Sequence, residues 1–312
     1  MDEQHLSSKE ISGGGSHDSL AKIHRDNALE LDTCDRYADD KYTDDVGSEF
    51  GNIGAHLEKI VSDRLFRVEE ADGKLYVGTE TNDLMSLDEI IDDIEFKSLT
   101  LSTQFIETYT QSVKRKTLFL SDRIESFNVL KSVAESYSAG LHQFTNCLMR
   151  GELEKFRDRV GAYDTDRPFS GKVRDILQHI LMISQAINNF RESDNTSLKQ
   201  RLQPRFFYRG DDMSKALCSR LEVGALFSER GFINTSESLE DAERCVQFEE
   251  NTVPVIFKLE TLDAVSADPF SIFLSEKSWV VMPTNFEIIA IKKNYGLENR
   301  QIHIVECRDM NR

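Results

Sequence analysis

The sequence has few basic residues relative to acidic ones. Against 55 Asp and Glu stand 38 Lys and Arg, which gives a formal net charge of −17 at pH 7. Binding to a nucleic-acid backbone relies on Lys and Arg that neutralise phosphates. A nucleic-acid-binding protein of the basic-patch kind is therefore not expected. The acidic excess instead favours solubility and attraction to basic partners.

Cysteine patterns are also missing. The five cysteines include no Cys-x-x-Cys pair, and no pair of His residues has metal-ligand spacing. This scatter argues against a disulfide framework and against a zinc site, and it predicts reduced, mostly buried thiols in a cytosol-like compartment. The cysteines are Cys34, Cys147, Cys218, Cys245 and Cys307.

Long apolar runs are absent too. No stretch approaches the roughly 18 apolar residues of a membrane span, and no basic-then-apolar leader opens the sequence. We therefore expect no membrane association and a cytoplasmic location, in the producing cell or, after delivery, in a host cell. Hydrophobic residues nevertheless make up 39% of the chain and include 19 Phe, which is enough for a substantial core.

Composition and periodicity divide the 312 residues into three segments. Residues 1–50 are predicted to be a disordered acidic segment, because they hold 13 acidic and 5 basic residues, a Gly-rich run and few aliphatics. Residues 51–193 are predicted to form a mainly helical domain with a small β-hairpin, and residues 200–312 a compact β-rich domain. The expected fold class is therefore α+β.

The helical domain is predicted from apolar side chains that recur every three or four positions between about residues 97 and 192. Before them, the turn Glu70–Gly73 predicts the hairpin, and Ser86 is expected to cap a short helix. His142 and His179 fall within the helical pattern without a partner at metal-ligand spacing. We expect both to be core or boundary histidines, and we predict no chemistry from this domain by itself.

Three apolar, strand-like runs of the C-terminal domain carry polar residues at their ends. The first, Phe207–Gly210, ends in an Arg, whose planar fork of donors suits a phosphate, and a Gly, which lets a ligand approach the backbone. The second, Gly231–Ser236, ends in small hydroxyl residues. The third is Glu276–Pro283, in which Glu276 and Ser278 would share one face of a strand. A carboxylate fixed at the rim of a packed strand is a candidate catalytic group.

In this order, the three runs resemble the signature of the toxin-like mono-ADP-ribosyltransferases of the Arg-Ser-Glu class. That signature is Arg-Gly, then Phe-x-Ser-Thr-Ser, then Glu-x-Glu followed by aliphatics and Pro. The pattern of Ser275–Pro283 is most similar to the phage Alt/Mod-type enzymes, which have Glu-x-Glu-Trp there. The resemblance covers about residues 200–310. It implies an ADP-ribosyltransferase-like domain that uses NAD as a substrate without a metal, and a helical domain that supplies target binding or delivery.

The resemblance also implies a role for each matching residue. Arg209 would bind the NAD phosphates, Gly210 would seat the nicotinamide, and Thr235 and Ser236 would brace the site. Asn234 stands where the family has its first Ser, which is a mild change because Asn can still hydrogen-bond. Breaking the nicotinamide–ribose bond develops an oxocarbenium-like cation, as in glycoside cleavage. The family therefore places a carboxylate near the ribose, in a cleft shielded from water.

The position of that carboxylate holds Ser278, which supplies no negative charge. Glu276 takes the position of the first family Glu, the one associated with arginine acceptors. Loss of one charge-stabilising group typically costs about 10²–10³ in rate. Three explanations stay open. Glu276 does the ribose work after a register shift, another acid such as Glu237 or Asp268 enters the cleft, or the domain binds NAD with little turnover.

Each piece also has a plain structural interpretation. Arg209 would form a surface ion pair with Asp211 or Asp212, a contact worth little energetically. Asn234–Glu237 would cap the helix that follows. Phe248, which would pack over the nicotinamide in the family interpretation, would instead belong to the core.

Our leading hypothesis is transfer of ADP-ribose from NAD to a protein acceptor, at an arginine side chain, by an intracellular toxin, an injected effector or a phage protein. The alternative is a catalytically impaired family member that binds NAD or a target. A third hypothesis is a structural α+β interaction protein with an accidental motif. The candidate catalytic residues are Arg209, Ser236, Glu276 and Ser278, and the candidate NAD-binding residues are Arg209, Gly210, Thr235, Ser236 and Phe248.

Overall fold

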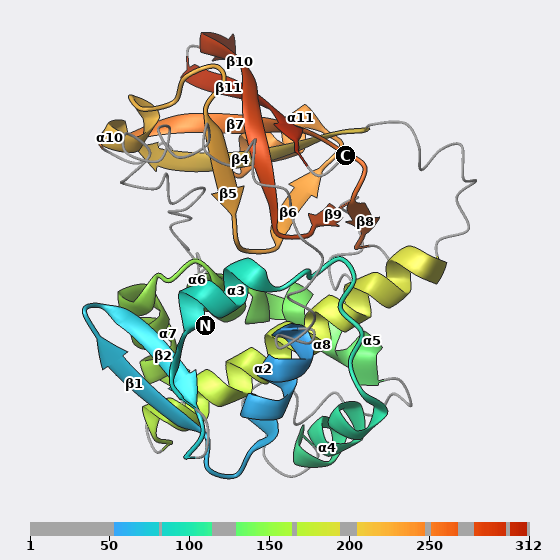
Figure 1. Cartoon of the computed structure of the whole chain (residues 1–312). Coiled ribbons are helices and arrows are strands. Elements are labelled where there is room, and N and C mark those ends of the chain that lie inside the picture. The colour runs from blue at the N-terminus through green and yellow to red at the C-terminus, as the bar shows by residue number, and fades with distance from the viewer. Residues whose placement is uncertain are drawn as a thin grey trace, which may run out of the picture.

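A helical part, built from residues 53–193, lies against a sheet of eight strands built from residues 205–310 (Figure 1). The predicted α+β fold class is therefore confirmed. The acidic segment 1–50 lies outside the described residues, so its disorder stays a prediction. The computed structural model describes residues 53–80, 83–113, 129–163, 167–193, 205–246, 251–267, 278–297 and 300–310.

The helical part is organised around its longest described helix, α8. Eight consecutive residues of α8, Leu181–Asn188, are buried. Between α5 and α6 the chain widens into a π-type turn, where Gly140 has a φ of 132°, a conformation that favours glycine. The helices are α2 (Ile53–Ser62), α3 (Leu87–Asp93), α4 (Thr103–Val113), α5 (Val129–Ser136), the π-type turn (Tyr137–Leu141), α6 (His142–Met149), α7 (Leu153–Tyr163) and α8 (Phe169–Ser193).

A small sheet of three strands belongs to the helical part. Its first two strands pair antiparallel around Asp72 and Gly73, whose φ angles are 52° and 72°. Two successive positive φ angles are typical of the tight hairpin turn that matches strand twist, so the predicted hairpin is confirmed. Ser86 stands at the N-cap position of α3, but its hydroxyl makes no capping bond. The short helix and its N-cap residue were predicted correctly, but the expected side-chain capping bond is absent. The strands are β1 (Arg67–Ala71), β2 (Lys74–Gly78) and β3 (Met85–Ser86).

The large sheet has the strand order β5-β10-β11-β7-β4-β6-β9-β8. Its neighbours are antiparallel except β11 and β7, which are parallel. Every short run that the sequence predicted as a strand overlaps one of these strands. The elements are β4 (Arg205–Ser214), α10 (Lys215–Cys218), β5 (Leu226–Glu229), β6 (Ile233–Ser236), α11 (Leu239–Arg244), β7 (Thr252–Thr261), β8 (Ala264–Ser266), β9 (Ser278–Val281), β10 (Thr284–Leu297) and β11 (Arg300–Asp309).

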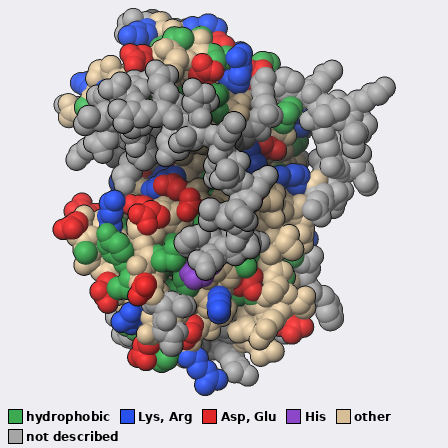
Figure 2. Space-filling view, in the orientation of Figure 1, with side chains coloured by type: hydrophobic (Ala, Val, Ile, Leu, Met, Phe, Trp, Pro, Cys, Tyr) green, Lys and Arg blue, Asp and Glu red, His purple; other side chains and the backbone are tan. Residues whose placement is uncertain are grey.

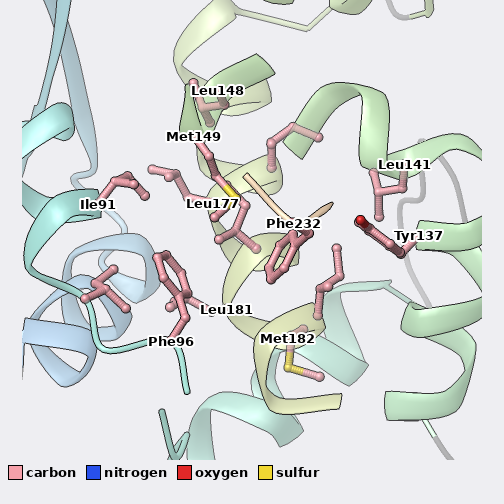
Figure 3. Packing of buried hydrophobic residues seen from close by; sticks show 14 of the residues in the cluster. Ile91, Phe96, Tyr137, Leu141, Leu148, Met149, Leu177, Leu181, Met182 and Phe232 are labelled. Atoms are coloured by element: carbon pink, nitrogen blue, oxygen red, sulfur yellow. The ribbon is translucent and has the colours of Figure 1, made fainter. Parts of the chain in front are cut away.

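The helices and one end of the large sheet share a hydrophobic core. Phe232, which precedes β6, is fully buried among side chains of the helical part, including Tyr137 and Leu181 (Figure 3). The side-chain amide of Asn146 on α6 donates to the Phe232 carbonyl at 2.9 Å and accepts from the Phe232 N–H at 3.0 Å. Val280 of β9 belongs to the same cluster. The helical part therefore fixes the position of β6 and β9.

A second connection between the two parts is ionic. Arg230, in the link between β5 and β6, donates to Asp88 at 2.8 Å and also binds Asp92, both on α3. Figure 2 shows acidic side chains gathered on the helical part, with Lys and Arg side chains beside them at its boundary with the sheet. The acidic excess of the sequence is thus partly used to bind the sheet.

Two further expectations concern membranes and cysteines. No helix among the described residues is long and apolar enough to cross a bilayer. Four cysteines lie in the described part, and all four are free thiols. Cys147 and Cys307 are buried, whereas Cys218 is partly exposed and Cys245 exposed. The prediction of mostly buried thiols therefore holds for half of these four.

Candidate functional site

The three polar strand ends singled out in the sequence lie on neighbouring strands. In the large sheet, Tyr208 of β4 pairs with Ser236 of β6, and Ser236 pairs on its other side with Ser278 of β9. Arg209 directly follows Tyr208. Segments far apart in the chain thus form one row across three strands.

β4 and β6 separate immediately after this row. β4 pairs with β7 along its whole length, from Arg205 opposite Thr261 to Ser214 opposite Thr252. β6 pairs with β9 along its whole length as well. Among the described residues, β4 and β6 share only the pair at Tyr208. The sheet therefore opens between β4 and β6 from Arg209 onward.

Arg209 is held inside the protein at this opening. Its side chain is 11% exposed and pairs with Asp211 at 3.4 Å. Its Nε is buried without a hydrogen-bond partner in the described part of the chain. The ion pair with Asp211 exists as the plain interpretation expected, but it is buried and not on the surface. A buried guanidinium with an unused donor is a natural ligand for an anion.

Asp211 is an unusual neighbour, because its side chain is fully buried. Burial raises the pKa of the Asp211 carboxyl to about 6, although Arg209 and Arg150 act to lower it. The backbone N–H of Asp212 donates to Asp211 at 3.0 Å. The charge of this carboxylate therefore depends on pH in the weakly acidic range.

Gly210 is needed for packing between β4 and α11. A Cβ atom at this position would lie 1.9 Å from the carbonyl oxygen of Ala242 and 3.0 Å from a methyl of Val246. The space that the sequence analysis reserved for a ligand is taken by α11 on this side of the strand. Its role in seating nicotinamide stays a prediction.

Asn234 faces the helical part. The hydroxyl of Tyr137 donates to its side-chain oxygen at 2.9 Å. Burial raises the pKa of Tyr137 above its usual value, so this phenol remains protonated and keeps donating at neutral pH. The residue that replaces the first Ser of the family motif is therefore oriented by a hydrogen bond from the helices.

Thr235 and Ser236 hold their surroundings together by hydrogen bonds. Thr235 donates to the carbonyl of Trp279 on β9 at 3.2 Å. Ser236 donates to Asp241 on α11 at 2.9 Å and accepts from the N–H of Ser238 at 3.0 Å.

The cap of α11 is Ser238, whose hydroxyl accepts from the N–H of Asp241 at 3.3 Å. The interpretation of Asn234–Glu237 as the helix cap was therefore wrong by a few residues. Such a shift is typical, because several neighbouring Ser, Asn and Asp residues are all good caps and only the turn geometry selects one.

The acids that were considered as substitutes for a carboxylate at position 278 differ in their location and contacts. Glu276 and Asp268 lie outside the described residues, as does Phe248. Glu237 is exposed, and its carboxylate binds Arg205. Ser278 begins β9 and is partly buried. Glu237 is therefore already engaged in an ion pair, and it is not a free replacement for the carboxylate that position 278 lacks.

Two groups near the site were missed in the sequence. The first is Arg150 of α6, which donates to the buried carboxylate of Glu229 at 2.7 Å, while the N–H of Gly231 donates to the same oxygen at 2.8 Å. The sequence held no signal for this pair, because its partners are 79 positions apart. The helical domain, from which no chemistry was predicted, contributes a charge close to Asp211.

The second missed group is a stack on the outer end of β4. The guanidinium of Arg205 lies 4.1 Å from the ring centre of Trp279 and 5.3 Å from that of Phe207. The single Trp of the chain was a signal in itself, but its partner could not be assigned without the pairing of β6 with β9.

The histidines take the places that the sequence predicted. His179 is buried in α8 beside the hydroxyl of Tyr109, and burial lowers the pKa of His179 to about 4. His142 sits at the boundary, with its ring 3.0 Å from the carbonyl of Tyr137. Among the described residues, no group of three or more His, Cys, Asp and Glu is arranged to hold a metal ion.

No protein-family model matches the sequence, and no curated protein matches it either. Solved structures are similar at low identity. The Vis toxin, an ADP-ribosyltransferase from Vibrio splendidus, is 20% identical with a TM-score of 0.41, over 69% of this chain and 89% of that one. Plx2a, an ADP-ribosyltransferase toxin from Paenibacillus larvae, is 18% identical with a TM-score of 0.38, over 66% and 96%.

The ADP-ribosyltransferase HopU1 of Pseudomonas syringae is 15% identical with a TM-score of 0.39, over 83% of this chain and 97% of that one. Likeness at this level assigns neither a family nor an activity. The functional argument has to come from the residues of this chain.

Proposed function

We propose that this protein transfers ADP-ribose from NAD to a protein acceptor and releases nicotinamide. The observation that carries the proposal is the row formed by Tyr208, Ser236 and Ser278, together with Arg209, which follows Tyr208 on β4 and is buried where β4 and β6 stop pairing. Three motifs that resemble one family signature in the sequence are separate in the chain, and they are adjacent in the fold. An accidental motif has no reason to assemble in this way.

The buried arginine gives the proposed substrate its anchor. Arg209 has an unused Nε donor and little exposure. The diphosphate of NAD would therefore bind a guanidinium for which water competes only weakly. Asn234 and Ser236 are held in place by Tyr137 and Asp241. Groups that are already oriented lose little entropy when a substrate binds, which favours catalysis.

The chemistry breaks the bond between the ribose C1′ and the nicotinamide nitrogen. The electron pair of this bond leaves with nicotinamide, which becomes neutral, and the ribose becomes an oxocarbenium-like cation. A nucleophile on the acceptor then bonds to C1′ and loses its proton. A carboxylate beside the ribose lowers the barrier by stabilising the cation, a contribution of about 10²–10³ in rate.

The finer features rest on the sequence. An arginine acceptor is inferred from Glu276, transfer of a single ADP-ribose from the family resemblance, and a phage-type relationship from Ser275–Pro283. Action in a cytoplasm is inferred from the scattered cysteines, which favour a reducing compartment. The helical part, which contributes Tyr137 and Arg150 near the site, would present or bind the target.

Calorimetry with NAD on the full chain tests the proposal first. Arg209→Lys keeps the charge that pairs with Asp211 but loses the planar fork, so we expect NAD affinity to fall at least about tenfold. The matched control is Arg308→Lys, an exposed arginine on β11 that pairs with Glu260, which should stay within about twofold. Absence of NAD binding by the wild type would leave the structural interaction protein as the explanation.

Radiolabelled NAD with candidate acceptor proteins tests the transfer itself. Label on protein together with released nicotinamide supports a transferase. Ser278 favours a second candidate function, an NAD-binding or target-binding module with impaired catalysis. Binding of NAD without nicotinamide release and without label transfer would select that second function.

A further inference from the structure

We propose that Asp241 supplies the catalytic carboxylate that position 278 lacks. The inference rests on the proposed function and names the acid of that same site. Asp241 lies in the first turn of α11, a helix that the family motif does not include. It was not among the acids that the sequence suggested.

Asp241 is connected to position 278 through Ser236. Ser236 and Ser278 are direct partners on β6 and β9, so their side chains point to the same face with Cβ atoms about 5 Å apart. The Ser236 hydroxyl donates to Oδ2 of Asp241 at 2.9 Å. The carboxylate of Asp241 is therefore bonded to the strand partner of Ser278, on the face from which a glutamate at 278 would project.

The carboxylate is also held as a catalytic group needs to be. The N–H of Asp241 is capped by Ser238 at 3.3 Å, and α11 packs so closely on Gly210 that no Cβ would fit between them. The residue therefore sits on a fixed helix and its Oδ2 is oriented by Ser236. Fixed charge at the place where a cation develops is the arrangement that lowers a barrier most.

The other contact of Asp241 leaves its negative charge in place. Its Oδ1 pairs with Arg244 at 2.8 Å, but the Arg244 side chain is 71% exposed. Exposed pairs at this helix spacing contribute little and are screened by water. Glu237 is a weaker candidate, because its carboxylate binds Arg205, and Arg205 is itself stacked on Trp279.

In the proposed step, the carboxylate of Asp241 faces C1′ of the ribose as the bond to nicotinamide breaks. The bonding electrons leave with nicotinamide, and the positive charge on the ribose is stabilised by Asp241 until the acceptor or water attacks. The attacking group then loses a proton to solvent. No oxidant, reductant or metal takes part.

Nicotinamide release from NAD by the full chain tests this role. Asp241→Asn keeps an oxygen that can accept from Ser236 and removes only the charge. We expect its kcat to fall about 10²–10³-fold, with KM for NAD within about threefold. Glu240→Gln, an exposed acid one position earlier, is the matched control and should keep the wild-type rate.

Introducing a glutamate at position 278 distinguishes a catalytic role of Asp241 from a structural one. In the Asp241→Asn background, Ser278→Glu should recover the rate to within about tenfold of the wild type, because the charge returns to the same face. A fold defect caused by Asp241→Asn would not be repaired by a change on β9. Recovery therefore shows that Asp241→Asn keeps the fold and the rest of the site, so that the single variant lost its rate through the missing charge.

Three outcomes would overturn the assignment. An Asp241→Asn variant with the wild-type kcat would show that another group serves, and the proposed function would stand. A wild type that binds NAD without turnover, while Ser278→Glu is active, would show that Asp241 does not serve. If neither protein binds NAD, the proposed function fails and the role of Asp241 fails with it.

Discussion

Two buried amides of helix α8 and the buried charged side chains of strands β4 and β5 differ in how their hydrogen bonds are satisfied. In α8, the amide of Asn188 donates to the carbonyls of Phe96 and Leu99 at 2.9 and 3.3 Å, and Gln185 accepts from the Leu101 N–H at 2.8 Å. These uncharged side chains connect α8 to the segment Phe96–Leu101 by hydrogen bonds.

The strands bury charges instead and leave some of their hydrogen-bonding capacity unused. Arg209 and Asp211 on β4 and Glu229 on β5 are enclosed. The Nε of Arg209 and the Oε2 of Glu229 are buried without a hydrogen-bond partner among the described residues. Buried polar atoms in native proteins are nearly always paired. The bonds of Asn188 and Gln185 therefore serve stability, whereas in the proposed function the unused donor of Arg209 is available to the NAD phosphates.

The largest expected effect comes from breaking the ion pair between Arg150 and Glu229. Arg150→Leu leaves a buried carboxylate without its cation, so we expect the free energy of unfolding to fall by about 3–5 kcal/mol. Urea unfolding at neutral pH measures it. The double variant Arg150→Leu/Glu229→Gln removes the stranded charge and should recover much of the loss. A single variant with almost wild-type stability would contradict the idea of a buried charge cluster.

The next effect is a pH dependence caused by Asp211. Burial raises its pKa from 3.8 to about 6, so the folded state holds this proton more tightly than the unfolded chain does. Its contribution to stability is fully present below pH 4 and is lost as the pH rises through about 6. The loss is at most about 3 kcal/mol, because one pKa unit corresponds to about 1.4 kcal/mol.

Asp211→Asn tests this sign directly. The variant lacks the titrating group, so its unfolding free energy relative to the wild type should increase between pH 4 and pH 7. Urea unfolding at a series of pH values gives the difference. A relative stability that is flat or decreases over this range would mean that burial does not raise the pKa of the Asp211 carboxyl.

The smallest expected effect on stability comes from removing a buried amide of α8 whose hydrogen bonds are satisfied. Asn188→Ala leaves two buried carbonyls without their donor, which should lower the free energy of unfolding by about 1–3 kcal/mol at every pH tested. Gln104→Ala, at an exposed position of α4, should stay within about 0.5 kcal/mol. NAD affinity should be unaffected by either change. A weaker NAD affinity in Asn188→Ala would contradict the distinction between structural groups and groups of the site.

Local patterns were sufficient for most of the elements, although the short strands β3, β5 and β8 were not predicted. The turn at Asp72 and Gly73 was predictable because few residues tolerate positive φ. The short apolar runs were recognisable as strands because a buried strand needs little more than a continuous β-prone segment. The cap of α11 was misplaced from Ser238 to Asn234–Glu237, since all of these residues favour caps and the choice depends on the exact path of the chain.

The site was predictable only in part. The order of Arg209, Ser236 and Ser278 in the sequence suggested that they belong together, and the register of β4, β6 and β9 puts their strands side by side. Arg150 and Asp241 were beyond reach. Neither matches a motif, and their importance comes from a partner that packing brings close.

The sequence by itself determined the α+β class, the hairpin, the strands and the absence of charge at position 278, because these depend on residue type and local spacing. Only the tertiary structure decided that Arg209 is buried with an unused donor, that α11 occupies the space beside Gly210, and that Asp241 is bonded to Ser236. Burial and proximity between distant segments arise from packing, so no local pattern encodes them.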